Sequence, residues 1–170
     1  MSGAPVGLST ARPARAEPII HIPSLGLGVR VRISAANGAG LPTVLETTNA
    51  AGMGPPLHRR AQSEIFEIVT GRFLFEVDGQ RFIARRGDLV SVPGGAARAF
   101  VNVTGTGARQ KVIIQPGIDA AAFFGELAQV LASDARGRSA RLRAFGKRWR
   151  VDYLGAPLDA RDALWHGGEP

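Results

Sequence analysis

Residues 52–71 read GMGPPLHRRAQSEIFEIVTG, and glycine and polar side chains recur in this stretch at regular distances. Five residues separate Gly52 from His58, and six separate Glu64 from Gly71. Beyond Glu64 the side chains are expected to alternate between the two faces of a strand, because a strand repeats with a period of two. The stretch therefore predicts a β-strand with one inward face, which ends in a tight turn at Gly71.

A second regularly spaced stretch follows at residues 87–102, which read GDLVSVPGGAARAFVN. Gly87 opens it and Asn102 ends it, with Pro93 and Gly95 between them. Proline cannot donate to a strand ladder, and glycine adopts conformations that other residues avoid, so both favour a bend. The stretch therefore predicts a return strand that turns a corner in a barrel.

Segments of β character separated by turn signals fill residues 18–116, with a turn roughly every 8–12 residues. Asp78-Gly79 lies between two of these segments, and this dipeptide favours the positive φ angles of a type I′ hairpin turn. The pattern predicts an all-β, antiparallel sandwich or barrel. The segments expected to form strands are 19–22, 29–33, 44–48, 64–70, 72–77, 80–84, 89–92, 97–103 and 109–115.

The periodicity changes after residue 116. Asp119 can cap an α-helix that runs to about Ala132, because its carboxylate can accept from a free backbone N–H of the first turn. The apolar residues of this segment share one helical face and are Phe123, Phe124, Leu127, Val130 and Leu131. A second helical piece is expected from Arg136, and residues 151–154 predict a short extended segment.

The length of 170 residues fits one domain. We expect a disordered leader at 1–17, a barrel at 18–116, a helical extension with a closing segment at 117–158, and a tail at 159–170. No run of 18 apolar residues is present, so we expect no membrane partner. The sequence contains no cysteine, which excludes disulfides, cysteine-bound metals and thiol nucleophiles.

The net charge of +7 is concentrated in one short stretch. Residues 134–150 hold seven basic residues and one acid, while the other 153 residues hold 14 basic and 13 acidic ones. Leu142, Phe145 and Trp149 lie among these basic residues. We interpret the stretch as an amphipathic element that docks through its apolar side chains, rather than as a surface for nucleic acid.

The two spaced stretches resemble the paired motifs of the cupin family. The first motif of that family carries two histidines and a glutamate, the second carries a histidine, and the spacings match from Gly52 and from Gly87. Two long patterns in the right order are far more specific than one short motif. Residues 54–58, 118–127 and 153–158 add to the similarity, which is to the single-domain cupins labelled quercetin-dioxygenase-like.

The resemblance implies an antiparallel double-stranded β-helix, the cupin jelly-roll barrel, with a C-terminal α-helix. A barrel of this kind encloses one cavity of small-molecule size, so the resemblance also implies a small-molecule ligand. Cupin barrels commonly pair, which implies a homodimer. We expect the protein to be bacterial and cytoplasmic, without nucleic acid as a partner.

The sequence departs from the family at the positions of the metal ligands. Cupin metals are usually held by the histidine pair and glutamate of the first motif and by the histidine of the second. Here His58 and Glu64 match, while Arg60 and Arg98 occupy the two other positions. A guanidinium stays protonated and has no lone pair to give to a metal, so we expect no bound metal and no other cofactor.

Two arginines can offer an anion the positive charge that a metal would otherwise supply. We expect Arg60 and Arg98 to bind a small anionic or phenolic molecule in the cavity. His58 and Glu64 are then the candidate catalytic pair for a proton transfer of the isomerase, cyclase or lyase type. The remaining candidate substrate-binding residues are Phe66, Phe100 and Gln110.

Other interpretations stay open at this point. Glu64 could pair with both arginines and fill the position of the metal, which would leave a structural barrel. The barrel could bind a ligand without catalysis, or it could be a metal-dependent, quercetin-dioxygenase-like oxygenase with an atypical ligand set. Phe66 and Phe100 would serve equally well as core residues, since both face inwards with the candidate site.

Overall fold

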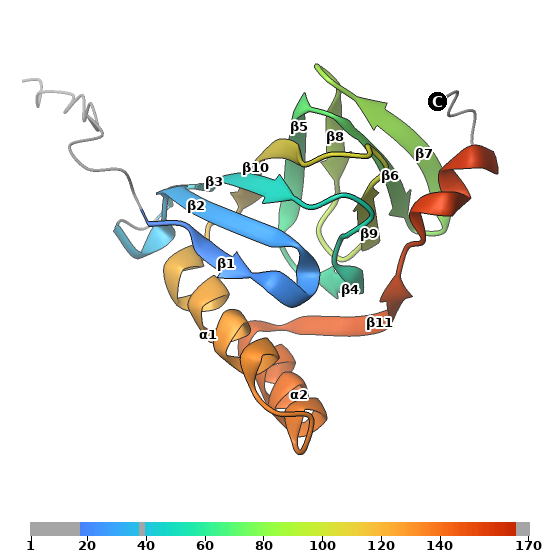
Figure 1. Ribbon diagram of the computed structural model, residues 1–170. Coiled ribbons are helices and arrows are strands. Elements are labelled where there is room, and N and C mark those ends of the chain that lie inside the picture. The colour runs from blue at the N-terminus through green and yellow to red at the C-terminus, as the bar shows by residue number, and fades with distance from the viewer. Residues whose placement is uncertain (1–17, 38–39, 166–170) are drawn as a thin grey trace, which may run out of the picture.

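The structure is a computed structural model that describes residues 18–37 and 40–165, and its strands form two antiparallel sheets (Figure 1). The strands are β1 (Ile20–Ile22), β2 (Leu27–Ile33), β3 (Thr43–Asn49), β4 (Pro56–Arg60), β5 (Ser63–Thr70), β6 (Arg72–Val77), β7 (Gln80–Arg85), β8 (Leu89–Val92), β9 (Ala97–Asn102), β10 (Ala108–Gln115) and β11 (Val151–Pro157). One sheet has the order β1-β2-β3-β10-β5-β8, and the other has the order β11-β4-β9-β6-β7. The predicted antiparallel jelly-roll barrel is thereby confirmed.

The two sheets are joined by a cluster of aromatic side chains. Phe66 of β5 meets Phe75 of β6 with ring centroids 5.3 Å apart, and it meets Phe100 of β9 at 5.5 Å. Both pairs are edge-to-face, an arrangement that adds about 0.5–1.5 kcal/mol to the gain from burial. The cluster fixes the distance between the sheets on one side of the candidate site.

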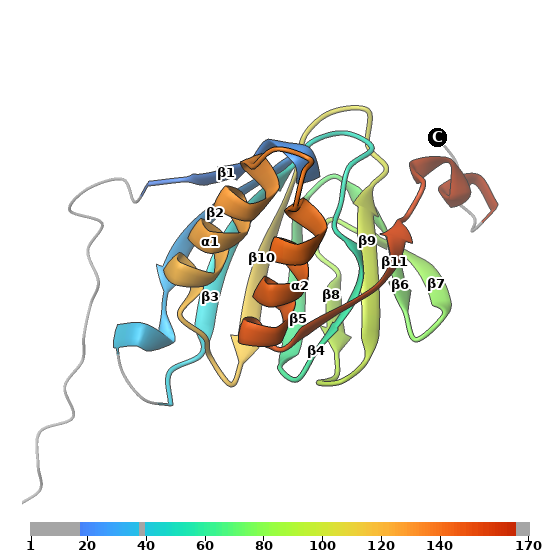
Figure 2. The same ribbon diagram turned by 90° about the horizontal axis from the view of Figure 1, so that it is seen from below.

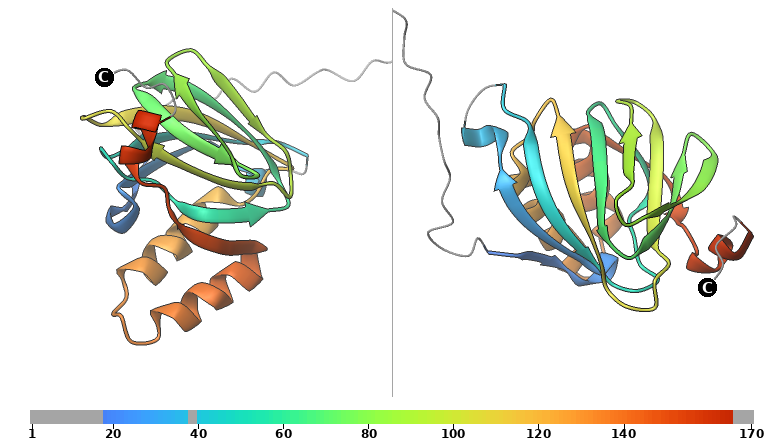
Figure 3. Two further views of the ribbon diagram at one scale, coloured as in Figure 1. Left: turned by 90° about the vertical axis from the view of Figure 1, so that its right-hand side faces the viewer. Right: turned by 90° about the horizontal axis from the view of Figure 1, so that it is seen from above.

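Two α-helices, α1 (Ala120–Ala132) and α2 (Arg138–Trp149), lie together on one side of the sheets (Figure 3). α1 begins where the sequence predicts, because the Asp119 carboxylate accepts from the Ala122 N–H at 3.1 Å. α1 contacts β1 and β2, and α2 contacts α1 and β11. β1 and β11 are edge strands of different sheets, so the helices bridge the two edges and cover the open side of the barrel (Figure 2).

The basic stretch docks as expected, although chiefly on α1 and β11. Phe145 is buried against Phe123, with ring centroids 5.1 Å apart, and the Trp149 indole N–H donates to Glu126 at 2.9 Å. Arg141, like most basic residues of this stretch, is exposed. In the described ranges no helix is long and apolar enough to span a bilayer.

Most predicted strands are confirmed with shifts of one or two residues at their ends. The hairpin between β6 and β7 has the expected turn, since φ is +46° at Asp78 and +80° at Gly79. β4 was not predicted as a strand, and it supplies two of the candidate site residues. The second helix expected from Arg136 is α2.

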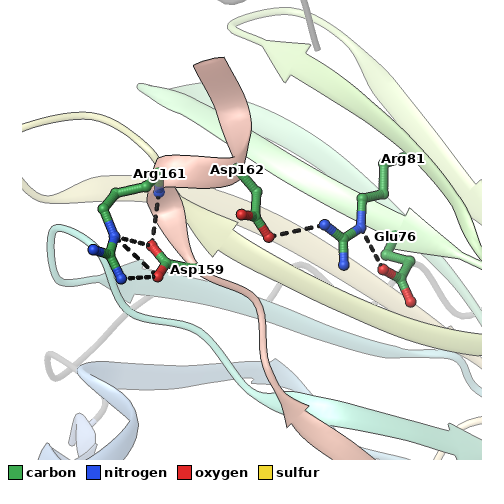
Figure 4. Close-up of polar contacts among 5 residues, drawn as sticks. All are labelled: Glu76, Arg81, Asp159, Arg161 and Asp162. Atoms are coloured by element: carbon green, nitrogen blue, oxygen red, sulfur yellow. Dashed lines mark hydrogen bonds and ion pairs between the residues drawn. The ribbon is translucent and has the colours of Figure 1, made fainter. Parts of the chain in front are cut away.

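The chain after β11 covers the outer face of the five-stranded sheet. Leu158 packs there with Leu74, Ala99 and Val101 in a small cluster of buried residues. The turn η3 (Ala160–Trp165) is tied to the β6–β7 hairpin by Arg81, which contacts Glu76 at 2.6 Å and Asp162 at 2.8 Å (Figure 4). The predicted tail therefore includes a packed turn up to residue 165, while residues 166–170 and the predicted leader 1–17 lie outside the described residues.

Candidate functional site

The candidate site lies where β4, β9 and β11 of one sheet face β5 of the other. His58 on β4 is paired in register with Arg98 on β9 and with Tyr153 on β11. Arg60 shares the inward face of β4 with His58, because the two are two residues apart. Glu64 enters from β5, so the site draws on both sheets.

Glu64 is shared by the two arginines. Its Oε1 lies 3.3 Å from Arg60 Nη1, and its Oε2 lies 3.2 Å from Arg98 Nε. All three side chains are at most 7% exposed. One carboxylate therefore faces two guanidinium groups in a buried setting, and one positive charge is left without a partner in this group.

The two arginines differ in what else they contact. Arg98 donates through Nη2 to the carbonyl oxygens of Gln62 at 2.9 Å and Pro93 at 3.3 Å, so it is anchored in the barrel wall. Burial lowers its pKa while Glu64 raises it, and the guanidinium stays charged in either case. Arg60 lies over the Phe123 ring at 4.8 Å, and its Nε has no hydrogen-bond partner among the described residues.

His58 is a neutral base with a fixed tautomer. Its Nδ1 lies 2.8 Å from the Pro56 carbonyl oxygen, which can only accept, so Nδ1 carries the proton and Nε2 the lone pair. Burial lowers the pKa of His58 from 6.5 to about 4, and the charge of Arg60 lowers it further in the same direction. The imidazole is therefore uncharged at neutral pH.

Tyr153 adds a neutral donor beside this base. Burial raises the pKa of its phenol to about 12, against the opposing effect of Arg60. The hydroxyl is therefore protonated across the physiological range. Together His58 and Tyr153 offer an acceptor and a donor next to an excess of positive charge.

The side chains enclose a cavity of about 90 Å³. On this measure one water needs about 10–15 Å³, so the cavity has room for a small organic molecule. Its wall is mostly apolar and includes Phe123, Phe124 and Leu127 of α1. The polar residues of the wall are Thr47, Asn49, His58, Arg60, Glu64, Gln110 and Tyr153.

Six of the seven predicted site residues line this cavity, namely His58, Arg60, Glu64, Phe66, Phe100 and Gln110. Arg98 is not among the lining residues of the described chain and touches the site through Glu64. Sequence reasoning missed Tyr153, Asn49 and Phe123. Phe123 was predicted on the apolar face of α1, but the helix pattern carries no signal for the strand that it covers.

The donor set does not fit a divalent metal. Both oxygens of Glu64 are engaged by arginines, and no group of three His, Asp or Glu side chains able to hold a metal ion occurs within residues 18–37 and 40–165. His58 has one nitrogen left, and the two other positions of the family pattern are guanidinium groups without a lone pair. The residues present are suited to an anion instead.

The sequence profile of the cupin domain family matches residues 44–114, which include β4, β5, β9 and β10. Solved structures with the same fold include an RmlC-like cupin from Shewanella frigidimarina, at 21% identity and a TM-score of 0.52 over 59% of this chain and 85% of that chain. A cupin-like protein from Thermotoga maritima matches at 13% identity and a TM-score of 0.54 over 84% of this chain and 86% of that chain.

KdgF from Halomonas sp. has 16% identity and a TM-score of 0.50 over 56% of this chain and 83% of its own. No curated protein matches the sequence. At these identities the structural matches show the fold alone. The family profile and the shared fold together support the cupin superfamily as the class of this chain.

Proposed function

We propose that the cavity binds a small organic anion and that His58 exchanges a proton with it. The observation that supports this proposal most directly is the pairing of two buried guanidinium groups with the single carboxylate of Glu64. An unpaired buried charge is costly, so an anionic ligand beside Arg60 would complete the charge balance. A carboxylate or a phenolate meets this requirement.

Arg60 is the group suited to contact the ligand, because it lines the cavity and its Nε has no partner in the described chain. Arg98 acts as a positioning residue in this proposal. It holds Glu64 from the barrel wall, and Glu64 in turn holds Arg60. The anion then meets a guanidinium whose place is already fixed, which reduces the entropy lost on binding.

His58 takes the proton through its Nε2 lone pair. In the ligand-free protein its pKa of about 4 makes it a weak base. A bound anion offsets the positive charge of Arg60 and therefore raises the basicity of His58 when substrate is present. The proton moves from a carbon or hydroxyl of the ligand to Nε2, and its return at a neighbouring atom gives an isomer, while the Tyr153 hydroxyl can donate to the oxyanion formed in between.

Binding without turnover is the second candidate, and the low pKa of His58 favours it. A metal-dependent, quercetin-dioxygenase-like oxygenase is the third. Metal analysis of untagged protein tests this third function, since a stoichiometric transition metal that is lost in a Glu64→Ala variant would overturn the metal-free proposal. The engagement of Glu64 by two arginines supports the opposite result.

Anion binding is tested by calorimetric titration with 3-phenylpropanoate and with its uncharged analogue 3-phenylpropanamide. We expect the carboxylate to bind at least about tenfold more tightly, an advantage of about 1.4 kcal/mol that Arg60→Met removes. Arg59→Met is the matched control, because Arg59 is exposed on the other face of β4. Equal affinity for both probes, or no binding of the carboxylate, would contradict the proposal.

Proton transfer is tested separately by NMR in D₂O with phenylpyruvate and related 2-oxo acids, whose carbon-bound protons exchange through an enol. We expect exchange above the uncatalysed rate in the wild type and background exchange in His58→Gln, with binding retained. Binding without faster exchange for any of these acids would favour the non-catalytic function.

A further inference from the structure

A second polar cluster lies in the cavity and takes no part in the charge pairing around Glu64. Gln110 and Asn49 both line the cavity, and each is only 1% exposed. The Gln110 side chain has no hydrogen-bond partner for either Nε2 or Oε1 among the described residues, and Asn49 has none for Oδ1. The Asn49 Nδ2 is in use, since it donates to Thr47 Oγ1 at 3.4 Å.

The strand register places this cluster at the opposite end of the cavity from Arg60 and Glu64. Gln110 on β10 lies opposite Ile68 of β5, while Glu64 of β5 lies opposite Ile114 of β10. Four residues of strand separate Glu64 from Ile68, which corresponds to about 13 Å along the sheet. Phe66 lies between them on the same inward face.

Buried amide groups without partners are unfavourable, at about 1–3 kcal/mol for each unsatisfied group. Three such atoms face one cavity here, one of them a donor and two of them acceptors. A ligand group that both donates and accepts satisfies this set, whereas an apolar group or a second anion does not. A hydroxyl or a carboxamide has the required chemistry.

We infer that the cavity is a two-ended binding site for an elongated molecule. The molecule carries an anionic group at the Arg60 end, an apolar or aromatic body beside Phe66 and Phe100, and a neutral hydroxyl or carboxamide at the end of Gln110 and Asn49. The anionic end of this inference rests on the proposed function. The hydrogen-bonding end rests on the unpartnered amides alone.

The test compares 3-(4-hydroxyphenyl)propanoate with 3-phenylpropanoate, which differ by one hydroxyl remote from the carboxylate. We expect the hydroxylated probe to bind the wild type about five- to tenfold more tightly, as one or two hydrogen bonds would produce. In Gln110→Met the preference disappears, and the affinity for 3-phenylpropanoate stays within about twofold. Gln115→Met is the matched control, because it makes the same change at an exposed position of the same strand.

The outcomes separate this inference from the proposed function. If both probes bind with equal affinity and Arg60→Met weakens both, the inference is wrong while anion binding stands. A preference for the hydroxyl that survives in Gln110→Met also overturns the inference. If neither carboxylate binds, both the proposed function and the two-ended site fail.

Thermal unfolding of the ligand-free variant supplies a second measurement. Methionine has nearly the length of glutamine and removes two unsatisfied polar atoms, so Gln110→Met should raise the melting temperature. Gln115→Met should leave the melting temperature nearly unchanged. A lower melting temperature for Gln110→Met would show that the amide is satisfied inside the protein, and it would overturn the inference.

Discussion

At the scale of single residues, the sharing of Glu64 between Arg60 and Arg98 dominates the energetics of the site. Removing one partner of a buried ion pair costs about 3–5 kcal/mol, because the charge that remains is uncompensated. We therefore expect Glu64→Ala to lower the free energy of unfolding by about this amount, measured by urea denaturation at pH 7.5. Acetate should restore part of the loss, since its carboxylate can enter the space left between the two guanidinium groups.

A surface ion pair provides the control for this variant. Glu67 contacts Lys111 at 3.1 Å, but both side chains are more than 40% exposed. Glu67→Ala should therefore cost less than about 1 kcal/mol, and acetate should have no specific effect on it. Equal losses for Glu64→Ala and Glu67→Ala would show that the buried group is not under the electrostatic constraint described above.

The residues of the candidate site could be predicted only in part from the sequence. The fixed spacing brought His58, Arg60 and Glu64 together correctly, because it reflects two strands that face each other. Gln110 had an uncertain strand phase, and the reason is physical, since the register of β10 against β5 shifts between Arg109 and Gln110. A bulge of this kind reverses the inward and outward alternation, and no local pattern in the sequence marks it.

At the scale of elements, local chemistry predicted α1 and the β6–β7 hairpin well. Asp119 caps α1, and Asp78-Gly79 adopts positive φ at both positions, so each depends on a side chain or a dihedral preference within a few residues. β4 was missed because it begins at Pro56 and carries His58 and Arg60 on its buried face. Proline and inward charges both contradict the usual pattern of a strand.

The packing of the C-terminal segment allows apolar and ionic contributions to be compared within one element. Leu158 is nearly buried against Leu74 and Val101, so Leu158→Ala should cost about 2 kcal/mol or more in the free energy of unfolding. Arg81 joins Glu76 and Asp162 at a more exposed position, and Arg81→Ala should cost less than about 1 kcal/mol. Urea denaturation measures both, and the reverse order would mean that the ion pairs rather than Leu158 hold the segment.

At the scale of the whole molecule, the cavity is completed by segments far apart in the chain. Phe123 of α1 and Tyr153 of β11 line it together with residues of both sheets. Contacts of this kind leave no periodic signal in the sequence, because each segment shows only that one of its faces is apolar. The barrel could thus be predicted from the two motifs, while the closure of its open side by α1, α2 and β11 could not. The homodimer implied by the cupin resemblance stays a prediction.

The burial of His58 makes the stability of the whole fold depend on pH. Its pKa is about 4 in the folded protein against 6.5 when exposed, so between these values the unfolded chain binds more protons. The free energy of unfolding should therefore be fully supported above about pH 6.5 and should fall as the pH decreases towards 4. A difference of this size corresponds to a loss of about 3 kcal/mol, at about 1.4 kcal/mol for each pH unit. Urea denaturation between pH 4 and 7.5 should show most of this slope removed in His58→Gln and retained in His21→Gln, whose histidine is exposed. An unchanged slope in His58→Gln would mean that carboxylates elsewhere govern the acid sensitivity, and that the imidazole in the cavity is not held in its neutral form.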